Sequence, residues 1–221
     1  MTHSFLYIYD PLCGWCYGSA PRLADLAKSF EVEMIPAGLF AGAGARPLDR
    51  SFASYAWASD QRIVKLTGQT FSSAYRSQIL NGDEQLLDST VATLAMTACS
   101  IVEPDKGPEA LKLIQEARYV GGEDITDLRV LVSLLSGNGF ADAAVLLQGH
   151  MTSVEAETAR RVAHGQMVLN QMNASGVPSL VADIQGERML MPSTLLYSSQ
   201  EQFAENLKGF SATIQQVIPA A

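Results

Sequence analysis

Cysteine is scarce in this sequence, which has only Cys13, Cys16 and Cys99 among its 221 residues. A small, odd number of cysteines in a chain of this length excludes the dense disulfide framework of small secreted domains. The three histidines show no metal-ligand spacing, and a single pair of cysteines supplies too few ligands for a structural zinc site. We therefore expect no metal ion and no bound cofactor.

Clusters of basic residues and long apolar runs are also missing. The 15 Lys and Arg are outnumbered by 23 Asp and Glu, and the net charge of −8 makes nucleic acid an unsuitable partner. No stretch approaches the roughly 18 consecutive apolar residues of a transmembrane helix, so a membrane is not an expected partner either. The first residues, Met-Thr-His-Ser, lack the basic segment of a secretory signal. They predict a cytoplasmic protein, unless a leader has been removed.

The cysteine pair lies between a β-prone run and a helix-prone run. Residues 5–9 are apolar and aromatic, and Asp10-Pro11 ends this run because proline cannot donate a ladder hydrogen bond. A helical pattern covers residues 14–30, and residues 31–36 resume as a strand. Such a βαβ unit is expected to have parallel strands. Residues 13–16, Cys-Gly-Trp-Cys, therefore mark the N-terminus of the crossover helix.

The remainder of the chain changes character twice. Residues 37–47 form a small-residue loop without the glycine spacing of a phosphate-binding loop, so we expect a surface connection bordering the active site. Helical patterns then dominate, and Thr152-x-x-Glu155 is typical of a capping box before the last of them. They cover residues 51–66, 71–80, 87–102, 108–119, 127–135, 141–147 and 154–172. A hairpin of residues 177–184 and 187–191 and a helix of residues 200–217 follow.

This order of elements predicts an α/β fold. Two parallel strands and one hairpin give a four-stranded mixed sheet with flanking helices, and a large all-helical insertion separates the two halves of the sheet. We expect an N-terminal half at residues 1–47, a helical insertion domain at 48–173 and a C-terminal half at 174–221. Hydrophobic residues make up 48% of the chain, which is enough for cores in both parts.

The position of the cysteine pair indicates thiol chemistry. Disulfide exchange requires a thiolate, and the unpaired N–H groups and positive dipole end of a helix N-terminus stabilise one. Cys13 precedes the helix, so we expect it to attack. Cys16, three residues later on the same side, can close a disulfide or resolve a mixed disulfide. Metal binding or incidental thiols are the alternative interpretation.

The chain resembles the thioredoxin superfamily in two places: the strand, Cys-Gly-Trp-Cys and helix at its start, and the segment Gly176-Val177-Pro178-Ser179 before the hairpin. The large helical insertion is similar to that of the DsbA-like branch. The sequence Asp-Pro-x-Cys-x-Trp-Cys-Tyr-Gly from Asp10 onwards resembles the cytoplasmic FrnE-like relatives, which are described as dithiol–disulfide isomerases. The resemblance covers the whole chain by architecture and is specific at these two places.

The resemblance implies a role for each matching residue. Cys13 would be the exposed nucleophile, Cys16 the buried resolving cysteine, and Gly14 and Trp15 the pair that tunes the redox potential. Val177 would contact the substrate backbone. One departure is the middle pair itself, which is Gly-Trp instead of the Pro-His of periplasmic oxidants or the Gly-His of isomerases. No imidazole is therefore available to stabilise the Cys13 thiolate, which argues against strongly oxidising behaviour.

The residue that follows Val177 also has an implied role. Pro178 would be the cis-proline that faces the disulfide. From the residues alone, the Val177-Pro178 bond allows two readings, a trans proline that starts a strand and a cis proline.

Three further residues have two readings each. Trp15 is either an exposed functional aromatic or a packing residue against the insertion. Asp10 is either a surface turn residue or a proton buffer near Cys16. Cys99 lies in an apolar helical pattern, where a buried structural thiol is the better expectation than a reactive one.

The preferred function is a cytoplasmic thiol–disulfide oxidoreductase that acts as a reductase or isomerase. Its partner would be a disulfide-containing protein or a small thiol such as glutathione, and the apolar insertion offers a surface for a homodimer. A second hypothesis is a glutathione-dependent enzyme of the kappa-class transferase or hydroxychromene-carboxylate isomerase type. Such enzymes usually have serine in place of Cys13 and lack the second cysteine. A third is a binding or scaffold protein with vestigial or metal-binding cysteines.

Overall fold

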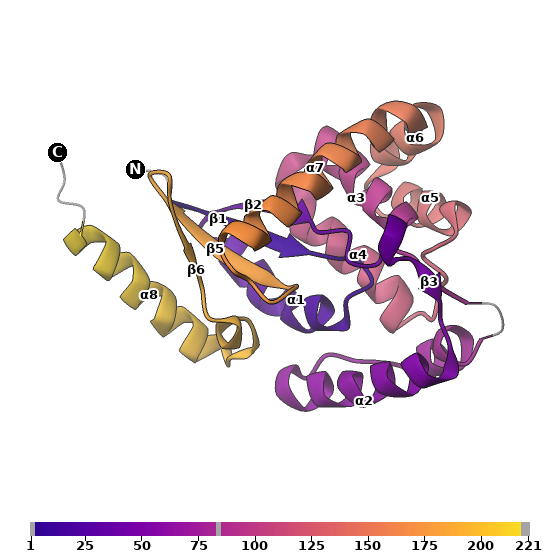
Figure 1. The fold of residues 1–221 in the computed structure, drawn as a ribbon, viewed down its shortest axis with the longest axis horizontal. Helices are drawn as coiled ribbons and strands as arrows, with labels where there is room; N and C mark the ends of the chain where they lie inside the picture. Colours follow the sequence, from indigo (N-terminus) through magenta and orange to yellow (C-terminus); the bar gives the residue numbers. More distant parts are fainter. Residues whose placement is uncertain (1–2, 83–84, 218–221) are drawn as a thin grey trace.

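A four-stranded mixed sheet forms the centre of the molecule (Figure 1). The computed structural model describes residues 3–82 and 85–217. The strands of the sheet are β1 (His3–Tyr9), β2 (Glu31–Pro36), β5 (Ser179–Ile184) and β6 (Glu187–Leu190). Their order is β2-β1-β5-β6, with β2 parallel to β1 and with antiparallel pairing between β1 and β5 and between β5 and β6. This topology confirms the predicted mixed sheet.

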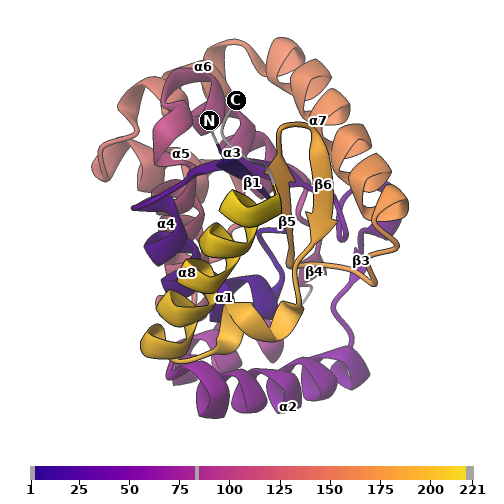
Figure 2. The same cartoon turned by 90° about the vertical axis from the view of Figure 1, so that its left-hand side faces the viewer.

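Helices cover both faces of the sheet (Figures 1 and 2). They are α1 (Gly14–Ala27), α2 (Arg50–Thr67), α3 (Thr90–Val102), α4 (Gly107–Tyr119), α5 (Leu128–Gly137), α6 (Ala141–Gly149), α7 (Met151–Gln171) and α8 (Gln200–Val217). Phe5 and Tyr7 of β1 belong to the core that contains α1, whereas Leu6 and Ile8 pack against α7. Because both faces of the sheet are covered, residues 5–9 of β1 are a continuous apolar run. Within the described residues, no helix is both long and apolar enough to cross a membrane.

Helix α1 continues through Pro21 and ends at Ala27, three residues before the predicted end. Proline has no N–H to donate to the carbonyl four residues earlier, which here belongs to Tyr17. The Gln69 side-chain amide donates to this carbonyl instead, at 3.0 Å. A residue that follows α2 therefore satisfies the backbone group that Pro21 leaves open.

The predicted helix at residues 87–102 starts late, at Thr90. Leu86–Leu87 forms the short strand β4, which pairs antiparallel with strand β3 at Arg46–Pro47. The Leu48 N–H extends this pairing by donating to the Gln85 carbonyl at 2.9 Å. Two-residue strands are too short to leave a periodic signal in the sequence, which is why the pattern did not predict them.

Two other helical predictions are also wrong in detail. The segment predicted as a helix at residues 71–80 contains a π-helix, η2 (Tyr75–Leu80), instead of a regular α-helix. Helix α7 begins at Met151 with His150 as its N-cap residue, so Thr152 lies inside the helix and does not cap it. Both segments contain ordinary helix formers, so the local sequence does not indicate these departures.

The helical part of the chain holds the loop that carries the cysteines. The Tyr119 hydroxyl of α4 donates to the Leu12 carbonyl at 2.9 Å, and the Gln115 side-chain amide donates to the Pro11 carbonyl at 3.4 Å. Helix α2 also packs closely on α1, because a Cβ atom on Gly18 would lie 2.5 Å from Cγ2 of Ile63. These contacts anchor the start of α1 against α2 and α4.

Candidate active site

Cys13 caps the N-terminus of α1. Its backbone is extended (φ −87°, ψ 113°), and its Sγ accepts a hydrogen bond from the Cys16 N–H at 3.4 Å. That N–H is one of the donors of the first helical turn that have no partner within the helix. Cys13 is only 7% exposed, so it is not the exposed residue that the resemblance implied, because the loop and the start of α1 pack against the helical part of the chain.

Cys16 lies one turn further along α1 and is completely buried. Burial raises the pKa of the Cys16 thiol well above its ordinary value, and the neighbouring Cys13 raises it further. Both cysteines are free thiols in the structure. The pair is therefore asymmetric in its burial: Cys13 is slightly exposed, whereas Cys16 is completely buried.

Val177 lies near the Cys13 sulfur, and Pro178 follows it in the chain. The bond between them is cis, and the Cys13 thiol approaches the Val177 carbonyl oxygen at 3.6 Å. Pro178 is buried and Val177 is half-buried. The Val177 N–H has no hydrogen-bond partner in the described part of the chain. An extended segment could pair with this residue beside the sulfur.

Trp15 is half-buried, so it is not fully exposed, and it packs against neighbouring side chains. Its ring packs edge-on against Tyr197 at 5.2 Å between centroids, and the Arg62 guanidinium lies 5.7 Å from the ring centre. The indole borders two hollows. One, of about 530 Å³, is lined by Val177, Pro178 and Tyr197, and the other, of about 210 Å³, contains Cys13.

Asp10 is not a surface turn residue. Its side chain is completely buried and accepts hydrogen bonds from three groups: the Leu12 N–H at 2.9 Å, the Phe40 N–H at 3.1 Å and the Ser89 hydroxyl at 2.8 Å. Burial raises the pKa of Asp10, and these hydrogen bonds oppose the shift. The carboxyl therefore joins the cysteine loop, the segment after β2 and the start of α3.

Comparison with known proteins identifies the fold of this site. Neither a family model nor a curated protein sequence matches the chain. A solved structure of the cytosolic disulfide reductase DsbM from Pseudomonas aeruginosa is 27% identical with a TM-score of 0.80, and the match covers 95% of this chain and 99% of that one. A proposed protein disulfide isomerase from Nitrosomonas europaea is 25% identical with a TM-score of 0.78, covering 96% and 99%.

The chain has the DsbA-like thioredoxin fold and is an oxidoreductase. This confirms the resemblance inferred from residues 13–16 and 176–179. A 2-hydroxychromene-2-carboxylate isomerase has the same fold at 12% identity and a TM-score of 0.53, covering 96% of this chain and 97% of that one. At that distance the likeness concerns the fold alone.

The DsbA-like oxidoreductase also has a buried cluster of polar side chains beside Cys13 that the sequence did not predict. Asp60 of α2, Tyr75 of η2 and Arg118 of α4 line the 210 Å³ hollow, and each is less than 5% exposed. A Cβ atom on Gly14 would lie 2.8 Å from the Asp60 Oδ1, so Gly14 leaves room for this carboxyl. Arg118 could have been noticed, because it falls on the apolar face of its helix four residues after Ile114.

Asp60 should make the stability of this oxidoreductase depend on pH. Burial raises its pKa to about 7, while the Tyr75 hydroxyl and the Arg118 cation oppose the shift. The folded protein then holds a proton that the unfolded chain releases near pH 4, so stability falls as the pH rises from about 4 to about 7 and levels off above that. Asp60→Asn removes this ionisation. Between about pH 5 and pH 8, wild type should lose roughly 2–3 kcal/mol relative to the variant, at about 1.36 kcal/mol per pKa unit.

Urea denaturation at the two pH values measures this difference. Asp127→Asn is the matched control, because hydrogen bonds from Arg129 lower the pKa of Asp127 and keep it ionised throughout this range. Its stability relative to wild type should not change between the two pH values. A constant difference for Asp60→Asn as well would contradict the shifted pKa of Asp60.

Proposed function

We propose that this oxidoreductase reduces or isomerises disulfides through Cys13 and Cys16, with a mixed disulfide as intermediate. The observation that carries this proposal is the Cys13 sulfur, which lies at the N-terminus of α1, 3.6 Å from the Val177 carbonyl oxygen. A substrate chain paired with Val177 would hold its own sulfur beside this position.

The reaction consists of two exchanges. The Cys13 thiolate attacks one sulfur of the substrate disulfide, a bond forms between them, and the other substrate sulfur leaves as a thiolate that takes up a proton. Cys16 then loses its proton and attacks the Cys13 sulfur. The substrate leaves as a second thiol, and the enzyme keeps the disulfide. The raised pKa of Cys16 keeps it protonated until the first exchange has occurred.

Two features favour the reducing direction. Strong oxidants of this fold stabilise their reduced form, chiefly the thiolate of the attacking cysteine. Here the intervening Gly14 and Trp15 carry no charge and no imidazole that would stabilise a Cys13 thiolate. DsbM, a relative with matching architecture, is described as a disulfide reductase.

The proposal extends to partner and location. DsbM has also been solved with GSH, in a structure 26% identical to this chain with a TM-score of 0.78, and it is described as cytosolic. We assign a disulfide-containing protein or a small thiol such as glutathione as substrate, and the cytoplasm as location. Residues 48–173 would act as the insertion domain that walls the substrate groove, between halves at 1–47 and 174–221.

The reduction potential of the Cys13–Cys16 pair, measured against glutathione buffers, tests the direction. We expect a value close to the about −270 mV of thioredoxin and far from the about −120 mV of a strong oxidant. A potential near the oxidising value would contradict the reductase assignment. Stoichiometric retention of glutathione without any exchange would instead support the glutathione-dependent isomerase or transferase alternative.

A further inference from the structure

The hollow of about 210 Å³ beside Cys13 has an exposed rim and a buried floor. Leu39 and Tyr55 line it and are 47% and 67% exposed. Asp60 and Arg118 also line it and are 4% and 2% exposed. A molecule entering past the rim therefore meets the Cys13 sulfur and a charged floor within one space.

Arg118 on this floor has unused hydrogen-bond donors. It is the largest fully buried side chain of the described residues, and its Nε and Nη1 have no hydrogen-bond partner. It forms no ion pair with any residue that the structure describes, and its guanidinium lies 5.7 Å from the centre of the Tyr75 ring. A buried cation without a hydrogen-bonded anion is costly, so the site favours an anion that would complete it.

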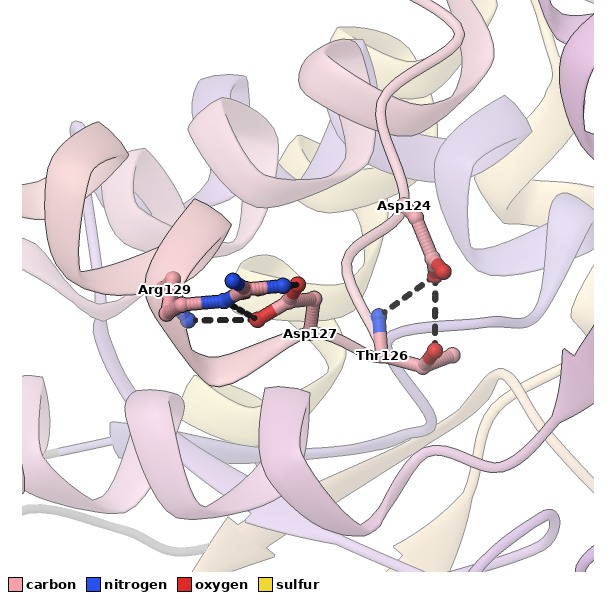
Figure 3. Close-up of polar contacts among 4 residues, drawn as sticks. All are labelled: Asp124, Thr126, Asp127 and Arg129. Atoms are coloured by element: carbon pink, nitrogen blue, oxygen red, sulfur yellow. Dashed lines mark hydrogen bonds and ion pairs between the residues drawn. The ribbon is translucent and has the colours of Figure 1, made fainter.

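Arg129 is an arginine of the same chain whose guanidinium has a carboxylate partner. Figure 3 shows it beside Asp127, to whose carboxylate it donates through Nε at 3.2 Å and through Nη2 at 2.6 Å. Arg129 is exposed to solvent, whereas Arg118 is buried. The exposed arginine thus has the bidentate partner that the buried one lacks.

Asp60 adds an acceptor to the same floor. Its Oδ2 is buried without a hydrogen-bond partner among the described residues. Burial raises the pKa of Asp60 to about 7, so near neutral pH a large part of this carboxyl is uncharged and repels an anion only weakly. An amino or amide N–H of a ligand could donate to it. The floor thus offers donors for a carboxylate and an acceptor for an N–H.

We propose that this hollow binds the carboxylate end of a small amino-acid-derived thiol or disulfide, with Arg118 as the carboxylate partner, and so places the substrate sulfur at Cys13. The inference rests on the proposed disulfide chemistry and names its substrate class. The volume lies below the roughly 300–1,000 Å³ of sites that enclose a whole drug-sized ligand. It therefore suits one end of a small molecule and is too small for a folded protein segment.

Cystine and cystamine provide a matched pair of probes, because both are small disulfides with amino groups and only cystine has carboxylates. For wild type, the kcat/KM for cystine should be about 10- to 100-fold higher than that for cystamine. This ratio is expected for one charge-assisted pair. Arg118→Met should bring this ratio close to one, and Arg129→Met should leave it unchanged. A wild-type ratio near one would overturn the proposal without any variant. So would an equal loss on both probes in Arg118→Met.

A binding measurement separates this inference from the proposed function. S-methylcysteine and S-methylcysteamine have no disulfide to react, and they differ in the carboxylate alone. Calorimetry should show that wild type binds S-methylcysteine at least about 10-fold more tightly than S-methylcysteamine, as expected for one charge-assisted pair. Preferential binding of S-methylcysteine together with no reduction of cystine or cystamine would support the carboxylate site in the hollow and refute the proposed reductase activity. Equal affinity for both compounds, or no binding of either, would refute the proposal that the hollow binds a carboxylate.

Discussion

Cys13→Ser is expected to lower disulfide reduction to the uncatalysed rate. In Cys16→Ser, Cys13 should still attack the substrate, but the reaction should stop at the mixed disulfide. A serine hydroxyl cannot exchange with a disulfide, so the first variant has no nucleophile at the mouth of the site. In the second variant the substrate stays bonded to Cys13, because the buried group that would release it is gone. Turnover of a small model disulfide measures the first effect, and the mass of the trapped adduct measures the second.

Cys99→Ser is the control for both variants. Cys99 is completely buried in α3, and burial raises its pKa to about 12, with a further contribution from the charge of Glu103. It should therefore remain a protonated, inert thiol, and its replacement should leave exchange intact. Retained activity in Cys13→Ser, or an adduct that forms on Cys99, would contradict the assignment of Cys13 as nucleophile.

Asp10→Ala should destabilise the fold by about 2–6 kcal/mol, because two buried donors left unsatisfied cost about 1–3 kcal/mol each, while a third, partly buried donor can turn to water. These donors are the Leu12 N–H, the Phe40 N–H and the Ser89 hydroxyl. They belong to three separate segments, so no single shift of the backbone could find new partners for all of them. Chemical denaturation of the reduced protein measures the free energy of unfolding.

Asp127→Ala is the matched control for this change. Asp127 is the exposed N-cap residue of α5 and accepts a hydrogen bond from the Arg129 N–H at 2.8 Å. Losing such a cap typically costs about 0.5–2 kcal/mol, because water can replace the lost acceptor. If the two aspartates cost the same, the buried network around Asp10 would not have the importance that its geometry indicates.

The sequence alone was sufficient for everything that depends on local patterns. Residues 5–9 are buried on both faces of a central strand, and such strands lack polar alternation. The break at Asp10-Pro11 places Cys13 and Cys16 at a helix start, one turn apart. The sheet and its flanking helices followed from the order of these signals. The pairing of β3 with β4 and the π-helix did not, because both depend on neighbours distant in the sequence.

The site shows the same division. Cys13, Cys16 and the proline segment could be found in the sequence because each has a recognisable local context. Only the fold could show that the Val177 carbonyl lies 3.6 Å from a sulfur 164 residues earlier, and that Asp10 is buried under three donors. Asp60 and Arg118 reach Cys13 from two helices that pack on α1. Burial and proximity arise from packing, and packing decided which charged side chains share a space with the reactive cysteine.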